Sequence, residues 1–286
     1  MKIQEVIDRI LAYHPQFPAD YAGCDGFKCG DPQAECTGVI TAISATIDVI
    51  RTAIEKNCNL IVVHEPTFYS TPDYAGWRAD FKNEVYEEKA KLLSDHGICV
   101  WRDHDHMHAH QPDGIFTGVI KWMGWEQYQK PVPEGIPFSF YFEIPETTVK
   151  DMGELLKEKL RLNGLRYIGD PDGVIRKIAL VGHLCVNAFG TDHEDENGYL
   201  HEYATEVIRL MENGVDAIIP GEVIDWTAVS YIRDAHMLGK NKTIYNVGHY
   251  NWEEPGMWYA QQWIQELVGN EVPVIFVPAG DIYQFM

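Results

Sequence analysis

Short apolar runs alternate with helical segments along the chain of 286 residues. The run Leu60–Val63 is wholly apolar, which is typical of a strand buried on both faces of a parallel sheet. Such alternation predicts an α/β fold with mostly parallel sheets. The other strand-like runs span 38–43, 98–101, 138–144, 177–181, 216–219, 243–247 and 272–277, and the helical ones span 3–13, 46–56, 81–95, 115–122, 148–161, 199–212, 226–238 and 256–267.

A stretch rich in proline and glycine, residues 129–137, separates two series of strands and helices. At roughly 150 residues per domain, the length allows one large domain or two modest ones. We therefore predict two α/β halves, residues 1–127 and 128–286.

The charge of the chain excludes some partners. Acidic residues outnumber basic ones 43 to 23, which gives a net charge of −20 and disfavours binding to nucleic acid. The apolar runs are too short to cross a membrane, and the N-terminus has no apolar signal region. We expect a cytoplasmic protein that binds no membrane, with its six cysteines as reduced thiols.

Histidine or glutamate follows many of the predicted strands. In open α/β sheets, ligands bind beyond the carboxyl ends of the strands, so these residues are expected to form a site. They are His64 and Glu65 after 60–63, His104 and His108 after 98–101, His183 after 177–181, Glu222 after 216–219, and His249 after 243–247, with Glu253 four residues further on.

The segment 103–110 holds four histidines at alternate positions, together with two aspartates. On an extended chain the four imidazoles would share one side, which favours a metal site over a solvated loop. Isolated histidines such as His14, His96, His201 and His236 are instead predicted to be surface or capping residues. Residues 193–196 are predicted to form a solvated acidic loop, and metal binding is the alternative.

Imidazole and carboxylate ligands suit zinc, iron, manganese or nickel. The cysteines at 24, 29 and 36 match no zinc-ribbon spacing, and no phosphate-binding or nucleophile-elbow motif is present. Ligands from several strands can hold two ions, and a water between two ions ionises near neutral pH and attacks carbon or phosphorus. The residues therefore favour metal-dependent hydrolysis.

Several motifs resemble the Nif-three-like dinuclear-metal family, whose members are also named GTP cyclohydrolase 1 type 2 homologues. Residues 26–32, Gly-Phe-Lys-Cys-Gly-Asp-Pro, resemble the N-terminal loop of the family. Residues 59–66 resemble its apolar strand ending in His-His-Pro, and residues 214–222 resemble its Gly-Ala-Asp and Thr-Gly-Glu stretch. Residues 248–253 resemble its closing Gly-His-x-x-x-Glu motif.

The resemblance implies a ligand set for two metal ions. The metal ligands of the family fall unchanged on His64, His249 and Glu253. Glu65 stands where the family has a second histidine, and His108 stands where it has an aspartate. Three histidines and two carboxylates are thereby kept, although Asp105 is an alternative source of the second carboxylate.

The resemblance also implies a fold of two intertwined α/β repeats with mixed, mostly parallel sheets, and a hexamer. The function expected is hydrolysis of a small, nucleotide-like substrate by two divalent transition metal ions, namely zinc, iron or manganese. His104 and Glu222 are then candidates for carrying protons in catalysis. The alternative is a metal-binding, metal-chaperone or scaffold protein without catalytic activity.

Overall fold

A computed structural model describes residues 1–286, apart from the side chain of Glu134, and the chain divides into two compact units. The first unit comprises Met1–Val119 and Glu253–Ala279, and the second comprises Ile120–Trp252 and Gly280–Met286. The division predicted from the sequence, 1–127 and 128–286, differs mainly at the C-terminal end. There the last strand of the chain pairs with a strand of the first unit, so this segment returns to that unit.

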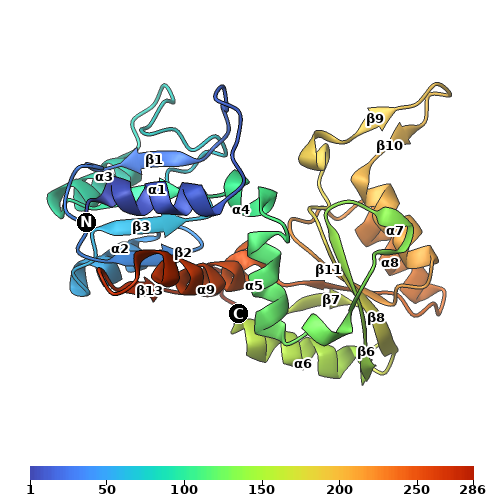
Figure 1. Cartoon of the computed structure of the whole chain (residues 1–286). Helices are drawn as coiled ribbons and strands as arrows, with labels where there is room; N and C mark the ends of the chain where they lie inside the picture. Colours follow the sequence, from blue (N-terminus) through green and yellow to red (C-terminus); the bar gives the residue numbers. More distant parts are fainter. The chain divides into compact units, whose positions relative to one another are not determined.

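The first unit is built on a five-stranded sheet with the order β1-β4-β3-β2-β13 (Figure 1). All neighbours are parallel except the edge strand β1, which runs antiparallel to β4. Residues 26–32 resemble a loop in sequence, and pairing with β4 makes residues 26–29 a strand. The strands are β1 (Gly26–Cys29), β2 (Val39–Ala42), β3 (Leu60–Val63), β4 (Cys99–Arg102) and β13 (Val274–Phe276).

Helices pack against this sheet through apolar side chains. Thr46 caps one of them by accepting a hydrogen bond from the backbone N–H of Val49, at the start of the predicted helical range 46–56. One core cluster joins Ile40 and Ile61 of the sheet to Ile50 of this helix. The helices that lie in the first unit or enter it are α1 (Ile3–Tyr13), α2 (Ile47–Glu55), α3 (Glu84–Asp95), α4 (Asp105–Ala109), α5 (Gly114–Met123) and α9 (His249–Val268).

Helix α9 begins earlier than the predicted range 256–267. Pro255 is a poor helix former, and the expected range began directly after it. In the structure Gly256 lies against α5, and a Cβ atom there would lie 2.7 Å from the Cδ1 atom of Ile115. Close packing of two helices therefore outweighs the low local propensity.

The second unit contains a mixed six-stranded sheet with the order β5-β6-β8-β11-β12-β7. Its central strands β8, β11 and β12 are parallel, and the other pairs are antiparallel. The mixed α/β class expected from the sequence is confirmed. The strands of this unit are β5 (Gln129–Lys130), β6 (Ser139–Thr148), β7 (Arg166–Ile168), β8 (Val174–Val181), β9 (His193–Glu194), β10 (Leu200–His201), β11 (Ala217–Pro220) and β12 (Thr243–Asn246).

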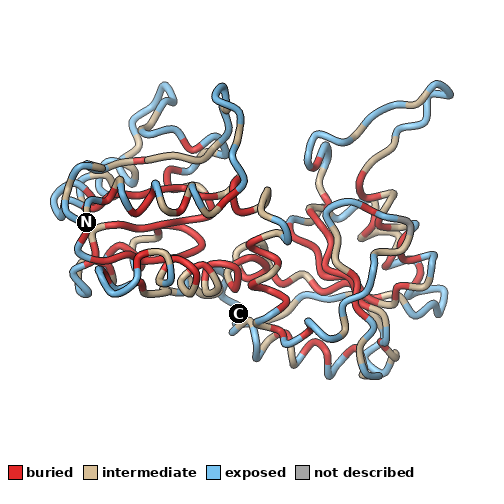
Figure 2. Tube along the Cα trace, in the orientation of Figure 1, coloured by how far each residue is buried: buried red, intermediate tan, exposed pale blue. Residues whose placement is uncertain are grey.

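Apolar side chains from two helices cover this sheet, and the strands are buried along much of their length (Figure 2). Strands β9 and β10 form a separate exposed hairpin where the sequence predicted an acidic loop. None of the helices in the described part of the chain combines the length and hydropathy needed to span a bilayer. The helices of this unit are α6 (Val149–Leu160), α7 (Tyr203–Glu212) and α8 (Ala228–Met237), with short 3-10 turns at Glu126–Tyr128, Pro133–Gly135 and Ala188–Gly190.

Candidate metal centre

Two neighbouring parallel strands of the first unit deliver the first histidines of the site. Strand β3 ends at Val63, which pairs with Arg102 at the end of β4. His64 and Glu65 follow the first strand, and His104 follows the second. Because the two strands are parallel and in register, their carboxyl ends place these residues at one edge of the sheet.

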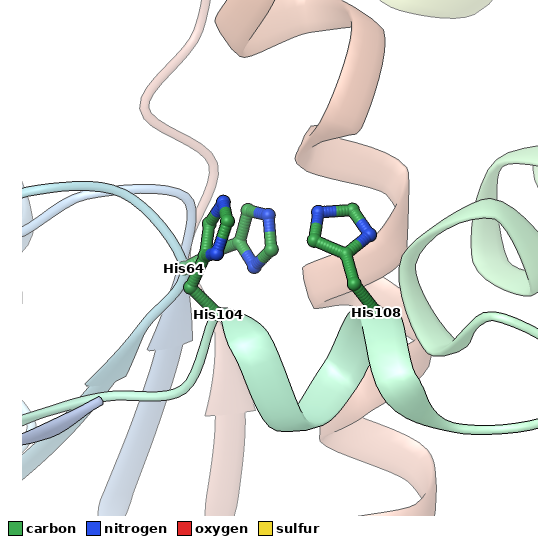
Figure 3. Close-up of side chains that lie close together, drawn as sticks. All are labelled: His64, His104 and His108. Atoms are coloured by element: carbon green, nitrogen blue, oxygen red, sulfur yellow. The ribbon is translucent and has the colours of Figure 1, made fainter. Parts of the chain in front are cut away.

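The histidine-rich segment after β4 forms the short helix α4, Asp105–Ala109. The extended conformation expected from the sequence is therefore wrong. His104 and His108 lie four residues apart, so a helix places both side chains on one face. Figure 3 shows their rings beside that of His64. The ring centroids of His64 lie 4.5 Å from His104 and 4.9 Å from His108.

A carboxylate from the N-terminal loop begins this helix. Asp25 accepts hydrogen bonds from the backbone N–H groups of His104 at 2.7 Å, Asp105 at 3.0 Å and His106 at 2.9 Å. It also lies 2.6 Å from Nδ1 of His106. A negative charge at a helix N-terminus stabilises the helix, so Asp25 holds the histidine-bearing segment in its helical form.

Each histidine of this cluster has an acceptor at its Nδ1 atom. This arrangement favours a proton on Nδ1 of the neutral ring and leaves Nε2 available to an ion, the usual pairing around protein-bound metal ions. The three pairs are His104 with Asp105 at 2.7 Å, His108 with Asp113 at 2.8 Å, and His64 with the main-chain oxygen of Asp103 at 3.3 Å.

Two glutamates bring carboxylates to the same place. Glu253 on α9 is buried, and its Oε2 atom lies 3.4 Å from Nε2 of His64. Candidate ligand atoms of His64, Glu65 and Glu253 all lie within 4.8 Å of one another. Those of His64, His104 and His108 satisfy the same limit. His64 is common to both groups, so the first unit brings three imidazoles and two carboxylates together at this buried histidine.

Glu65 has a cationic partner that the sequence analysis did not identify. The Nη2 atom of Arg102 lies 3.5 Å from Oε2 of Glu65, and both side chains are almost fully buried. Arg102 also donates hydrogen bonds to the main-chain oxygens of His64 at 2.9 Å and Thr71 at 3.0 Å. The guanidinium therefore fixes the backbone at the end of β3 and compensates the charge of Glu65.

The surroundings change the proton affinity of two of the histidines. Burial acts to lower the pKa of His108, but the hydrogen bond and charge of Asp113, with the charge of Glu253, outweigh it and raise the pKa to about 9. Burial also lowers the pKa of His104, and the nearby His64 lowers it further. In the metal-free protein, His108 is therefore a stronger base than an ordinary histidine, and His104 is a weaker one.

Asp105 was the alternative ligand predicted from the sequence. Its Oδ1 atom faces Nδ1 of His104 and accepts from the Cys24 thiol at 3.3 Å, and its Oδ2 atom accepts from the Tyr21 hydroxyl at 2.5 Å. The hydrogen bond with His104, joined by that from Tyr21, holds the pKa of Asp105 far below its ordinary value. The geometry suits a carboxylate that orients His104.

His249 and Glu222 belong to the second unit. Oε1 of Glu222 lies 3.0 Å from Nδ1 of His249, which repeats the carboxylate–imidazole pairing of the first unit. The backbone N–H of Glu222 donates to Nδ1 of His183 at 2.9 Å, so the ring proton of His183 is on Nε2. His249 begins α9 one helical turn before Glu253, and the division between the units falls within this helix.

Sequence reasoning missed several supporting residues. Asp25 and Asp113 act across long or irregular connections that no spacing rule covers. His14, expected at the surface, is 4% exposed, and its Nε2 atom lies 3.2 Å from Asp103. It packs edge-on against Trp263 of α9, a contact that only the folded chain creates.

The chemistry of this cluster fits a transition metal ion. Nε2 of His64 is buried, lies 3.4 Å from Oε2 of Glu253, and makes no hydrogen bond within the described part of the chain. A buried polar atom without a hydrogen bond costs free energy, and a metal ion would supply the missing interaction. Imidazole nitrogens with carboxylate oxygens form a donor set suited to zinc, iron or manganese.

Comparisons with known proteins identify the family of the chain. The family model of Duf34/NIF3 (NGG1p interacting factor 3) matches residues 1–183. A Clostridium acetobutylicum protein named GTP cyclohydrolase 1 type 2 homolog is 28% identical over 239 residues, which cover 81% of this chain and 78% of that protein. A Clostridium perfringens protein of the same name is 24% identical and covers both chains fully.

Solved structures share the fold. A crystal structure of a Staphylococcus aureus protein superposes with a TM-score of 0.69 at 19% identity, covering 100% of this chain and 99% of that one. A Bacillus cereus protein related to NIF3 gives the same TM-score and coverage at 15% identity. With the match of the family model over most of the chain, we conclude that this chain belongs to the Duf34/NIF3 family.

Proposed function

We propose that this chain binds two divalent transition metal ions and uses them to hydrolyse a small molecule. The ligands proposed in the first unit are His64, Glu65, His104, His108 and Glu253, and His249 of the second unit is the further proposed ligand. Three of these imidazoles carry a carboxylate at Nδ1, and His64 carries a main-chain oxygen there. This repeated pairing is the observation that carries the proposal, because it presents Nε2 to an ion.

Different residues have different roles in the proposed reaction. A divalent metal bound here would polarise a substrate oxygen and lower the pKa of water, the chemistry of metal-dependent hydrolases. Asp105 and Asp113 hold the imidazoles of α4 in orientation. Glu222 is half-exposed and bonded to Nδ1 of His249, so it is placed to exchange a proton with solvent. His104 lies among the candidate ligands, which suits metal binding better than proton transfer.

Metal analysis tests the binding step. Chelator-treated protein, reconstituted separately with zinc, iron and manganese, should take up two ions per chain with at least one of the metals. The variant His64→Ala should lose most of the metal, whereas His96→Ala, at an exposed position that ends α3, should keep it. Absence of binding would refute the metal centre, and saturation at one ion would refute the dinuclear form.

Turnover tests the catalytic step. The compounds to be tested as substrates are a phosphoester, an amide, a purine and GTP. GTP is included because relatives carry the name GTP cyclohydrolase 1 type 2 homolog. Hydrolysis that rises with metal content and is lost in His64→Ala supports the enzyme. Full metal loading without turnover of any substrate would favour a metal-binding or scaffold protein instead.

We also propose that the protein is a homo-oligomer, specifically a hexamer. This proposal rests on the resemblance to the family. Light scattering should give six times the chain mass of 32.6 kDa. The mass of a single chain would refute it.

A further inference from the structure

The second unit contains a cavity of about 370 Å³, and the proposed metal chemistry does not identify the molecule that it would bind. Its walls are Gly221–Val223 after β11, Asn246–Asn251 between β12 and α9, and Asp281–Phe285 near the C-terminus, with Arg166 at the start of β7. A volume of this size falls in the range of small-molecule pockets. The cavity also lies beyond the carboxyl ends of two parallel strands, where α/β proteins bind ligands.

The N-terminus of α9 forms one end of this cavity. The backbone N–H of Trp252 donates to Gly248 at 2.9 Å, so the amides of the preceding turn have no acceptor within the helix. The helix is 20 residues long. Its N-terminus therefore carries a partial positive charge that attracts anions.

A second observation also points to a ligand. Asn251 lines the cavity and is 3% exposed, and its Nδ2 atom makes no hydrogen bond within the described part of the chain. Arg166 is exposed at the cavity, and among the described residues its guanidinium has neither a hydrogen bond nor an ion pair. An amide donor and a guanidinium both match the oxygen atoms of an anion.

The carboxylates at the cavity already have donors. Asp281 accepts hydrogen bonds from the backbone N–H groups of Asn163 at 2.8 Å and Tyr283 at 3.0 Å. Glu222 is paired with His249. Their negative charges are thus partly compensated, and the donors of Arg166 and Asn251 remain for a ligand.

The rest of the wall is aromatic. Tyr250, Tyr283 and Phe285 line the cavity, and the last two are 63% and 52% exposed. The ring of Phe285 sits against Gly164, where a Cβ atom would lie 2.7 Å from it. This contact seats the C-terminal segment, so the aromatic wall is part of the folded unit. A flat apolar group would bury these exposed rings.

We propose that this cavity binds a small phosphomonoester with an aromatic body. The phosphate would accept hydrogen bonds at the N-terminus of α9 from Asn251 and Arg166, and the ring would lie on the aromatic wall. Three kinds of donor line this one cavity, which favours a phosphate, with three oxygens to accept them, over a carboxylate. Since His249 lines the cavity and is also a proposed metal ligand, a molecule bound here would lie beside that imidazole, a step that rests on the proposed function.

Calorimetry with the full-length, chelator-treated protein tests the site without relying on metal. Phenyl phosphate should bind, and phenol should bind at least about tenfold more weakly because it lacks the charged acceptor. Inorganic phosphate should bind weakly, and benzoate more weakly than phenyl phosphate. Equal affinity for phenol and phenyl phosphate would overturn the anion site. Tighter binding of benzoate than of phenyl phosphate would reassign it to carboxylates.

Variants locate the site. Arg166→Gln and Asn251→Ala should each weaken phenyl phosphate binding about tenfold, whereas Arg233→Gln, an exposed arginine of α8 outside the cavity, should not. Phe285→Ala should weaken phenyl phosphate but leave inorganic phosphate unchanged. A thermal unfolding measurement on each variant checks that it is folded. Unchanged affinity in both Arg166→Gln and Asn251→Ala would refute the proposal.

The metal-free measurement keeps the two proposals separate. If phenyl phosphate binds here but the protein takes up no metal, the cavity stands and the proposed function fails. If metal binds at His64 but phenyl phosphate does not bind, the metal centre stands and this inference fails.

Discussion

Replacing Glu65 with glutamine removes the carboxylate that lies 3.5 Å from the buried guanidinium of Arg102. The side chain keeps its size and loses its charge. At an effective dielectric constant of about 20, two unit charges at this distance attract by about 5 kcal/mol. Removing one partner of a buried ion pair typically costs about 3–5 kcal/mol, because the remaining charge is buried without compensation. We expect Glu65→Gln to destabilise the metal-free first unit by an amount in this range.

Backbone amide exchange of β3 and β4, followed by mass spectrometry in chelator-treated protein, measures the stability of this unit directly. The matched control is Glu271→Gln, which removes the acid of an exposed ion pair, Arg9 Nη2 to Glu271 at 3.0 Å. An exposed pair is worth at most about 1 kcal/mol. A loss in Glu65→Gln no larger than that of the control would refute the reasoning.

A double variant tests whether the pair is the cause. Adding Arg102→Met to Glu65→Gln removes the uncompensated charge as well. The double variant should then be less destabilised than the sum of the two single variants. Additive losses would mean that Glu65 and Arg102 act on the fold independently.

Two further predictions concern the histidine-bearing helix α4. His108, whose pKa the folded protein raises from 6.5 to about 9, should add about 3 kcal/mol of stability to the metal-free protein below pH 6.5, a contribution lost as the pH rises through 9. Denaturant unfolding from pH 6 to 10 should show this loss in the wild type and a flatter profile in Asp113→Asn, which keeps a capping side chain but not the charge; matching profiles would contradict the assignment. Asp25→Asn should weaken metal binding about 10-fold to 100-fold because it loosens the helix. The exposed control Asp20→Asn should leave metal affinity unchanged. A competition titration with a chromophoric chelator would measure both affinities.

Local patterns were sufficient for many elements. The wholly apolar run Leu60–Val63 is a strand with the predicted bounds, because four consecutive buried side chains suit a central parallel strand. The helical range 46–56 was predicted with its correct start, because Thr46 caps the helix through a hydrogen bond that spans only three residues. His64 and Glu65 directly follow the strand Leu60–Val63, so the correct bounds of this strand also place these two residues at its carboxyl end.

The histidine segment shows where local patterns fail. Alternate histidines suggested an extended chain, and the segment is a helix because Asp25, some 80 residues away in sequence, accepts hydrogen bonds from its first amides. The exchange of ligands at Glu65 and His108 stays a prediction, and the structure adds the partner of each side chain. Glu65 has Arg102 as its partner and His108 has Asp113, and neither contact follows from spacing.

Residue types and short-range periodicity therefore predicted the α/β class, most strands and helices, and the candidate metal-binding residues. The tertiary structure decided which of these side chains meet, which atom of each imidazole is left for an ion, and which charges are compensated. The reason is physical: propensity and capping act over a few residues, whereas burial and electrostatic pairing depend on segments that only the folded sheets bring together.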